Sequence, residues 1–213
     1  MPPRGSSESN AVYLGLWQRP ATPESTEPSS LLAVFPIRRT TLPTGYLSRT
    51  LRDLKPSRFP ASPYMATTPL PQDFEDFLKL LSSHRVEFLL IGGYAVGLHG
   101  YPRGTADLDV WVSISDQNAN RLVEALREFG FDMPKLTPSL FLEEDKLVRM
   151  GVPPLRIDIL TSIAGVNFEE SFSRRKLISS GDLEIPVISL QDLKANKRAT
   201  GRRQDLTDMD NLP

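Results

Sequence analysis

Three aspartates of this chain could act together as a catalytic carboxylate cluster. Asp107 and Asp109 alternate along the apolar stretch DLDVWV, and Asp158 lies in the similar stretch LRIDIL. Successive side chains of a strand point to opposite faces, so Asp107 and Asp109 share a face, and Asp158 can join them if the two strands are neighbours. Such carboxylates repel one another unless cations lie among them, and paired divalent cations promote phosphoryl and nucleotidyl displacements.

The expected cation is Mg²⁺ or Mn²⁺ bound by oxygen ligands. The chain contains no cysteine and only two histidines, which excludes zinc thiolate sites, disulfides and thiol catalysis. A metal-dependent phosphodiesterase is a competing interpretation, but such a site usually contains more histidines than two.

A glycine pair, Gly92-Gly93, follows the apolar run VEFLLI, and 13 residues separate Gly93 from Asp107. Without Cβ atoms the backbone can approach a phosphate closely, and free N–H groups at the start of a helix favour negative charge. A glycine pair is more often a plain turn, and Asp-x-Asp is more often a solvated strand edge. Their combination with a third aspartate favours a phosphate and metal site.

The apolar periodicity predicts an α/β (α+β) domain, with a small mixed β-sheet flanked by helices. Asp116 and Ser189 are expected to cap two of these helices. The predicted helices span 71–83, 94–99, 116–129, 167–172, 190–200 and 203–212, and the predicted strands span 86–91, 108–112, 140–142, 146–150, 155–160, 176–180 and 183–187.

Residues 1–64 have the composition of a disordered tail, and the domain is predicted to span 65–213. The tail holds 10 of the 19 prolines and shows no sustained period, although the apolar patches at 13–17 and 31–35 could pair or dock. We hypothesise that the functional protein starts near Met65 and that the upstream segment is an over-extended reading frame or dispensable. A chain starting at Met65 is then expected to keep full stability and activity.

Charge and hydropathy favour a cytoplasmic protein without a membrane partner. The formal net charge is -1, and no apolar run has the length of a membrane span. The N-terminus also lacks the zones of a secretory signal.

The segment IGGYAVGLHGYPRGTADLDVWV resembles the signature of nucleotidyltransferases of the DNA polymerase β superfamily. It is most similar to the small bacterial branch that includes AbiEii-like toxins and minimal nucleotidyltransferases. The C-terminal KRATGRRQDLTDMDNL is similar to the end of the same domain. The matching residues are Gly92, Gly93, Ala95, His99, Gly100, Arg103, Thr105, Asp107, Asp109, Lys197, Gly201, Arg202, Asp205 and Asp208.

This resemblance implies a nucleotidyltransferase-like fold, transfer of a nucleoside monophosphate from an NTP to an acceptor hydroxyl, and release of pyrophosphate. It implies that Asp107 and Asp109 bind metal, together with Asp158 as the third carboxylate that helps deprotonate the acceptor. The implied nucleotide-binding residues are Gly92, Gly93, Arg103, Thr105 and Lys197. The implied acceptors are tRNA, a protein or a small molecule, and an antitoxin protein is a further implied partner.

The chain departs from the wider superfamily at Gly93, where serine is common, so Gly93→Ser is expected to be tolerated and Gly93→Val to fail. It also ends before the helical C-terminal domain of larger AbiEii-type proteins, which leaves the acceptor-binding surface unassigned. Asp107→Asn and Asp109→Asn are each expected to abolish transfer and to leave the fold intact or more stable.

Several residues of the chain have two interpretations from the sequence. His99 contacts a ligand or bonds a carbonyl at a helix end, and Tyr94 stacks a base or packs over the sheet. Lys197 contacts phosphate or lies in solvent on a helix. The arginines at 198, 202 and 203 form an RNA-binding patch or a salt-bridged surface. The whole chain could also be a non-catalytic nucleotide-binding or interaction module that retains the fold.

Overall fold

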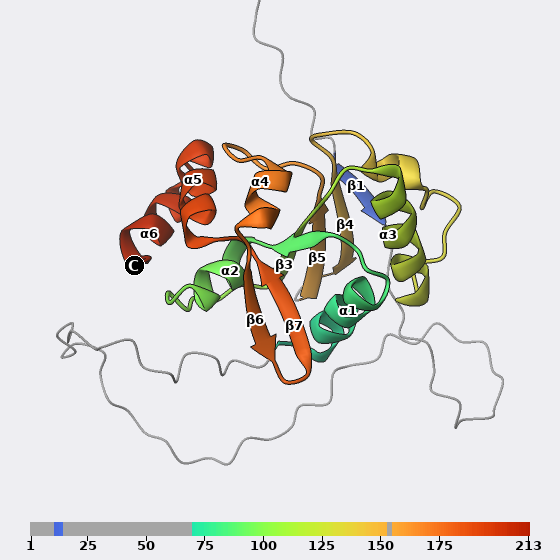
Figure 1. Cartoon of the computed structure of the whole chain (residues 1–213), viewed down its shortest axis with the longest axis horizontal. Helices are drawn as coiled ribbons and strands as arrows, with labels where there is room; N and C mark the ends of the chain where they lie inside the picture. The colour runs from blue at the N-terminus through green and yellow to red at the C-terminus, as the bar shows by residue number, and fades with distance from the viewer. Residues whose placement is uncertain (1–10, 15–69, 153–154) are drawn as a thin grey trace, which may run out of the picture. The chain divides into compact units, whose positions relative to one another are not determined.

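The computed structural model describes residues 11–14, 70–152 and 155–213. In this part of the chain, seven strands form one mixed sheet in the order β1-β4-β5-β3-β2-β7-β6 (Figure 1). The strands are β1 (Ala11–Leu14), β2 (Phe88–Leu90), β3 (Asp107–Val112), β4 (Leu147–Val152), β5 (Leu155–Leu160), β6 (Lys176–Ser180) and β7 (Leu183–Val187). The helices are α1 (Gln72–Ser83), α2 (Gly92–Leu98), α3 (Asp116–Glu128), η1 (Pro138–Phe141), α4 (Phe168–Ser173), α5 (Leu190–Thr200) and α6 (Arg203–Asn211).

Strand β3 lies in the middle of the sheet, antiparallel to β2 and parallel to β5. Helices α1 and α3 lie on one side of the central strands, and α2, α4, α5 and α6 lie on the other (Figure 1). This sandwich of helices around a mixed sheet confirms the fold class predicted from the sequence.

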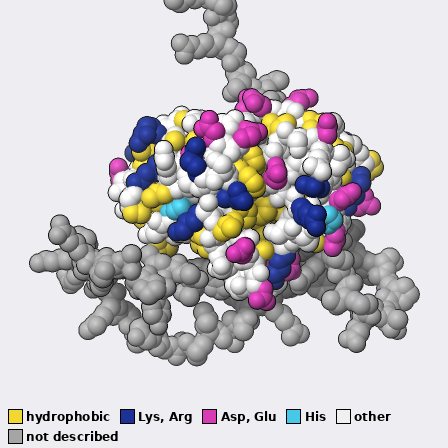
Figure 2. Space-filling model, in the orientation of Figure 1, with side chains coloured by type: hydrophobic (Ala, Val, Ile, Leu, Met, Phe, Trp, Pro, Cys, Tyr) yellow, Lys and Arg dark blue, Asp and Glu magenta, His cyan; other side chains and the backbone are white. Residues whose placement is uncertain are grey.

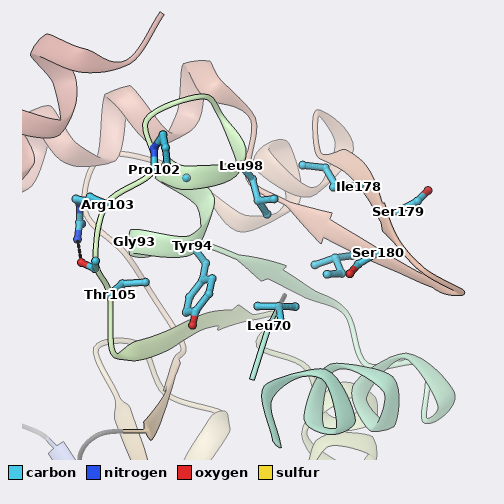
Figure 3. A pocket seen from close by; sticks show the side chains of 13 residues that line it. Leu70, Gly93, Tyr94, Leu98, Pro102, Arg103, Thr105, Ile178, Ser179 and Ser180 are labelled. Carbon is cyan, nitrogen blue, oxygen red and sulfur yellow. Dashed lines mark hydrogen bonds between the residues drawn. The ribbon is translucent and has the colours of Figure 1, made fainter. Parts of the chain in front are cut away.

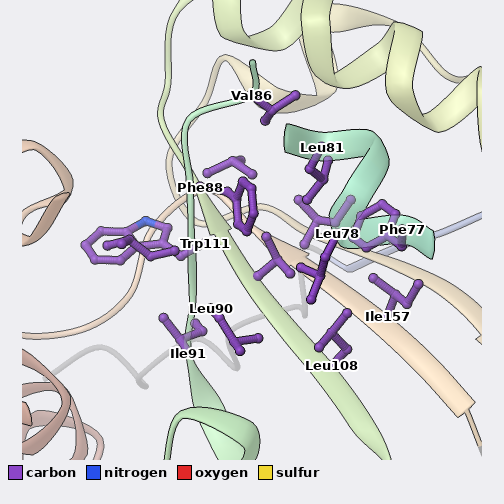
Figure 4. Packing of buried hydrophobic residues seen from close by; sticks show 14 of the residues in the cluster. Phe77, Leu78, Leu81, Val86, Phe88, Leu90, Ile91, Leu108, Trp111 and Ile157 are labelled. Atoms are coloured by element: carbon purple, nitrogen blue, oxygen red, sulfur yellow. The ribbon is translucent and has the colours of Figure 1, made fainter. Parts of the chain in front are cut away.

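The main core lies between β3 and α1. Leu108 and Val110 alternate with the aspartates along β3, and both are fully buried. They face the apolar side of α1, where Phe77, Leu78 and Leu81 are also fully buried (Figure 4). One face of β3 therefore anchors the strand, which leaves the face that carries Asp107 and Asp109 available for chemistry.

Two local predictions are wrong. A strand is predicted at residues 140–142, but they belong to η1 and its end, because Pro138 occupies the first turn, where a missing N–H costs nothing. Asp116 is predicted to cap α3, but the preceding Ser115 is the N-cap, and its hydroxyl accepts the N–H of Asn118. Asp116 instead places a negative charge in the first turn of α3.

Strand β1 lies within residues 1–64, whose composition predicts a disordered tail. Ala11–Leu14 pairs in parallel with Leu147–Met150 of β4, at the end of the sheet. The apolar AVYL suits a strand, and β4 offers an unpaired edge that a short strand can satisfy. The other residues of 1–64 lie outside the described residues, so the boundary at 64/65 and the hypothesis of a start near Met65 stay predictions.

A chain that starts at Met65 should lose β1 but keep its core. The buried apolar residues from Phe74 to Leu212 form one core cluster, so the chain should still melt cooperatively. Its free energy of unfolding should fall by about 1–3 kcal/mol, because a few backbone hydrogen bonds to β4 disappear. Chemical denaturation of both lengths measures this difference.

Replacing Val12 and Tyr13 together by proline in the full chain is the matched control. Successive N–H groups of a strand point to opposite edges, so one of these two faces β4, and proline removes it. Equal stability of all three proteins would show that β1 contributes nothing to folding.

None of the helices within 11–14, 70–152 and 155–213 is both long and apolar enough to cross a membrane.

Candidate active site

The three predicted carboxylates lie on one face of β3 and β5. The parallel register sets Asp109 directly opposite Asp158, and Asp107 opposite Arg156. The antiparallel register of β4 sets Arg149 on the other side of Asp158. Strand alternation and these two registers therefore collect three acidic and two basic side chains on adjoining strands.

Each arginine of this face holds one aspartate through two hydrogen bonds. Arg156 donates to Asp107 from Nε at 2.8 Å and from Nη2 at 2.6 Å. Arg149 donates to Asp158 from Nε at 2.8 Å and from Nη2 at 2.6 Å. Neither arginine has a function assigned from the sequence, although alternation already places Arg156 on the face of Asp158. Bidentate pairs of this kind are both strong and directional.

Asp109 is the carboxylate of this face that lacks a bidentate arginine among the described contacts. Burial, followed by the charges of Asp158 and Asp107, raises its pKa from 3.8 to about 6, against the opposing effects of the Gly93 N–H and of Arg202. The face thus remains short of positive charge around Asp109, even with both arginines in place.

Gly92 and Gly93 position the start of α2 against this face. Gly92 has a left-handed backbone with φ of +63°, and a Cβ on it would overlap the Asp109 carboxylate. The N–H of Gly93 donates to Asp109. In this arrangement the glycine pair brings the backbone to a carboxylate, and a contact of the pair with triphosphate stays a prediction.

Gly93 also packs tightly against Thr105. A Cβ on Gly93 would lie 2.6 Å from Oγ1 and 2.7 Å from Cβ of Thr105. The Thr105 hydroxyl donates to the backbone oxygen of Asp107 at 3.3 Å, which holds the side chain in place. The space that a serine at position 93 would need is therefore filled from the neighbouring loop.

Gly93→Ser should consequently reduce stability and activity in this chain, contrary to the expectation from the wider superfamily. The Thr105 side chain must move, and overpacking of this kind costs about 1–3 kcal/mol. Adding Thr105→Gly should recover most of the loss, since it removes both clashing atoms. Thermal melts of the two single variants and the double variant give the coupling. Strictly additive losses would show that this contact does not explain the glycine.

The C-terminal helices form a buried ionic cluster on the other side of the cleft. Lys197 of α5 is 3% exposed, and its Nζ donates to Asp205 at 2.9 Å and to Asp208 at 2.6 Å. Arg103 donates to both oxygens of Asp208, at 2.7 and 3.0 Å. Arg202 donates to Asp205 at 2.6 Å. This cluster ties the loop before β3 to α5 and α6.

The cluster determines the charge state of its two aspartates. Burial alone would raise the pKa of Asp205, but hydrogen bonds from Arg202, Thr200 and Lys197 lower it to about 2. Burial of Asp208 is likewise outweighed by Arg103 and Lys197, which lower its pKa. Both aspartates are therefore ionised at neutral pH, and the interpretation of Lys197 as a solvated side chain is wrong. A phosphate contact by Lys197 stays a prediction.

One cleft of about 740 Å³ joins the acidic face to this cluster. Every site residue predicted from the sequence lines it: Gly92, Gly93, Arg103, Thr105, Asp107, Asp109, Asp158 and Lys197. Arg149, Asn196, Arg202, Gln204 and Asp205 line it as well. Its volume is typical of small-molecule sites, and both carboxylates and cations line it.

A second cavity of about 240 Å³ lies on the other side of the start of α2 (Figure 3). It shares Gly93, Arg103 and Thr105 with the cleft. Tyr94 lines it and makes an edge-to-face contact with Phe74, with ring centroids 5.8 Å apart. The packing interpretation of Tyr94 therefore accounts for its position.

His99 and Arg202 both have protein partners in the structure. His99 Nε2 lies 2.7 Å from the backbone oxygen of Ile188, and burial lowers the pKa of the imidazole, so the ring is neutral and donates to that carbonyl. This geometry favours the structural role. Arg202 is 74% exposed in its side chain but paired with Asp205. Basic and acidic side chains are interspersed over the described residues on the face shown in Figure 2.

The donor chemistry of the acidic face fits a divalent cation. Within residues 11–14, 70–152 and 155–213, no three carboxylates or imidazoles are already gathered at ligand geometry. However, burial and then the charges of Asp158 and Asp107 raise the pKa of Asp109, and a cation beside these carboxylates would offset both effects. Asp107, Asp109 and Asp158 would hold Mg²⁺ or Mn²⁺, which prefer such oxygen ligands.

Among solved structures, the chain is similar to a Thermotoga maritima protein described as a "putative nucleotidyltransferase". The identity is 15%, the TM-score is 0.45, and the match covers 64% of this chain and 88% of the other. No protein-family model matches the chain, and no curated protein matches its sequence. The functional interpretation therefore rests on the cleft residues themselves.

Proposed function

We propose that the chain is a metal-dependent nucleotidyltransferase that moves a nucleoside monophosphate from an NTP to an acceptor hydroxyl, with release of pyrophosphate. The observation that supports this most directly is the register that sets Asp109 opposite Asp158, with Asp107 on the same face. Mg²⁺ or Mn²⁺ bound by these aspartates would neutralise charge on the phosphates during the displacement.

The roles of the three carboxylates follow from their surroundings. Asp107 and Asp109 share β3, and Asp109 lies against Gly92 at the start of α2, so we assign both to the metal and the triphosphate, as the sequence resemblance implies. Asp158 lies one strand further from α2, so we assign it to the acceptor hydroxyl, as the general base. Arg103, Thr105, Lys197 and the glycine pair line the same cleft and would position the nucleotide.

The proposal extends to the acceptor and to the biological role of the chain. The sequence resemblance to AbiEii-like and minimal nucleotidyltransferases supports a toxin that acts beside an antitoxin protein. The same resemblance supports a tRNA end, a protein side chain or a small molecule as acceptor. Incubation with each α-labelled NTP, Mg²⁺ or Mn²⁺, and total RNA or lysate would identify the pair that reacts.

A non-catalytic nucleotide-binding module is the second candidate. The bidentate pairs that Arg149 and Arg156 make with Asp158 and Asp107 favour it, because they neutralise two of the three carboxylates without a metal. The two candidates differ in whether NTP is converted to pyrophosphate in a single turnover. A protein that binds NTP tightly and releases no pyrophosphate with any acceptor fraction would be such a module.

Asp158→Asn should separate binding from catalysis. Affinity for NTP with Mg²⁺ should stay within a few fold, because Asp107 and Asp109 would still hold the cation that binds the triphosphate. The single-turnover rate should fall by about 10²–10⁴, the usual contribution of a positioned general base. Calorimetry with a non-hydrolysable NTP beside rapid-quench measurements tests this. An equal loss of binding and rate would overturn the assigned role, and unchanged transfer would overturn the site.

A further inference from the structure

Arg149 and Arg156 occupy the positions in which the proposed function needs divalent cations. Each guanidinium binds both oxygens of its aspartate, with shortest contacts of 2.6 Å. A guanidinium bound to both oxygens occupies the chelating edge of the carboxylate, so a metal ion cannot bind both oxygens at that edge while these two bonds remain. The metal and the arginines must therefore compete for Asp107 and Asp158.

Both arginines pair with aspartates that line the cleft. Arg149 itself lines it, and the side chains of Arg149 and Arg156 are 24% and 31% exposed. Their Cα atoms lie opposite Asp158 and Asp107 in the sheet, so a small rotation of the long side chain moves the charge without moving the strand. A released guanidinium is an always-charged fork that matches phosphate oxygens.

We propose that Arg149 and Arg156 neutralise the acidic face in the metal-free protein, and that they become a polyphosphate-binding pair when a divalent cation takes Asp107 and Asp158. This inference rests on the proposed metal-dependent function and assigns Arg149 and Arg156 a role in binding its polyphosphate substrate. The exchange couples the binding of metal and of triphosphate. Metal bound to the aspartates releases the arginines for triphosphate, and triphosphate bound to the arginines leaves the aspartates available to metal.

Mn²⁺ alone is the first probe, titrated by calorimetry without nucleotide. Arg156→Gln should bind Mn²⁺ about tenfold more tightly than the wild type, because no guanidinium competes for Asp107. Arg174→Gln is the matched control, since Arg174 makes the same two-bond contact with Asp192 at 3.2 and 2.9 Å, away from the cleft. Its Mn²⁺ affinity should equal that of the wild type.

Inorganic triphosphate is the second probe, added to protein saturated with Mn²⁺. Arg156→Gln should now bind it about tenfold more weakly than the wild type, because one charged contact is missing. Arg149→Gln should behave in the same way and provides the test if Arg156→Gln does not melt cooperatively. Opposite changes in the two affinities are not expected from an arginine that only stabilises the fold.

The outcomes distinguish this inference from the proposed function. Mn²⁺ affinity that falls in Asp109→Asn but is unchanged or weaker in Arg156→Gln overturns the exchange and leaves the metal site standing. Unchanged triphosphate affinity in the metal-saturated arginine variants overturns the exchange as well. Mn²⁺ binding that ignores Asp109→Asn overturns both the exchange and the metal-dependent function.

Discussion

Asp109→Asn is expected to abolish nucleotidyl transfer and to stabilise the metal-free protein at neutral pH. Asparagine keeps an oxygen that accepts the Gly93 N–H but removes the charge that Asp158 and Asp107 repel. Loss of a direct metal ligand should lower the transfer rate by about 10³ or more. Because one pKa unit corresponds to about 1.4 kcal/mol, a pKa of about 6 in place of 3.8 corresponds to about 2–3 kcal/mol of added stability.

The pH dependence follows from the same shift. The folded protein binds the Asp109 proton more tightly than the unfolded chain, so this aspartate contributes stability below about pH 4. The contribution is lost as pH rises through about 6. Denaturation of the metal-free wild type between pH 4 and 7 should show this loss, and Asp109→Asn should lack it. Mg²⁺ should restore stability to the wild type alone.

Asp107→Asn is the informative companion, and here the structure revises the expectation that both variants stabilise. Asp107 is held by Arg156 in a partly exposed pair, so its replacement removes a favourable contact worth about 0–1 kcal/mol. Transfer should be lost in both variants, whereas stability should rise only in Asp109→Asn. Equal gains in stability would show that the Arg156 pair is not formed in solution.

Lys197→Met is expected to cost about 3–5 kcal/mol of unfolding free energy, enough to unfold a marginal domain. The side chains of Asp205 and Asp208 are 3% and 0% exposed, and methionine would remove one of the two charged partners of each and leave Arg202 and Arg103 alone. The two aspartates would then take up protons more readily. The lowered pKa values of the two aspartates stabilise the wild type, and this stability is lost only as pH falls below about 4. In Lys197→Met the same loss should begin at a higher pH.

Lys79→Met is the control for this substitution. Lys79 also pairs with a carboxylate, Glu75 at 2.7 Å, but its side chain is 48% exposed and solvent screens the pair, so the loss of stability should be close to zero. Urea denaturation of both variants gives the comparison. If Lys197→Met costs no more than Lys79→Met but weakens NTP binding, the lysine serves the nucleotide and not the fold.

Local patterns in the sequence determined which residues could form the site. Alternation placed Asp107 with Asp109 on one face of DLDVWV and Arg156 with Asp158 on one face of LRIDIL, and the structure keeps both pairings and joins them on the same face of the sheet. The hairpin at 176–187 and the Ser189 cap were also predicted correctly. These features depend on backbone periods and on turn chemistry, which act over a few residues.

Only the tertiary structure decided what each side chain touches. The register of β3, β4 and β5 pairs Asp109 with Asp158 across the sheet and gives Asp158 its arginine, and a shift of one residue would send these side chains to the opposite face. Packing between separate segments decided three further features. These are the burial of Lys197, the contact of Gly93 with Thr105 and the pairing of β1 with β4. Periodicity carries no information about such contacts, because their free energy depends on the non-local surfaces that meet.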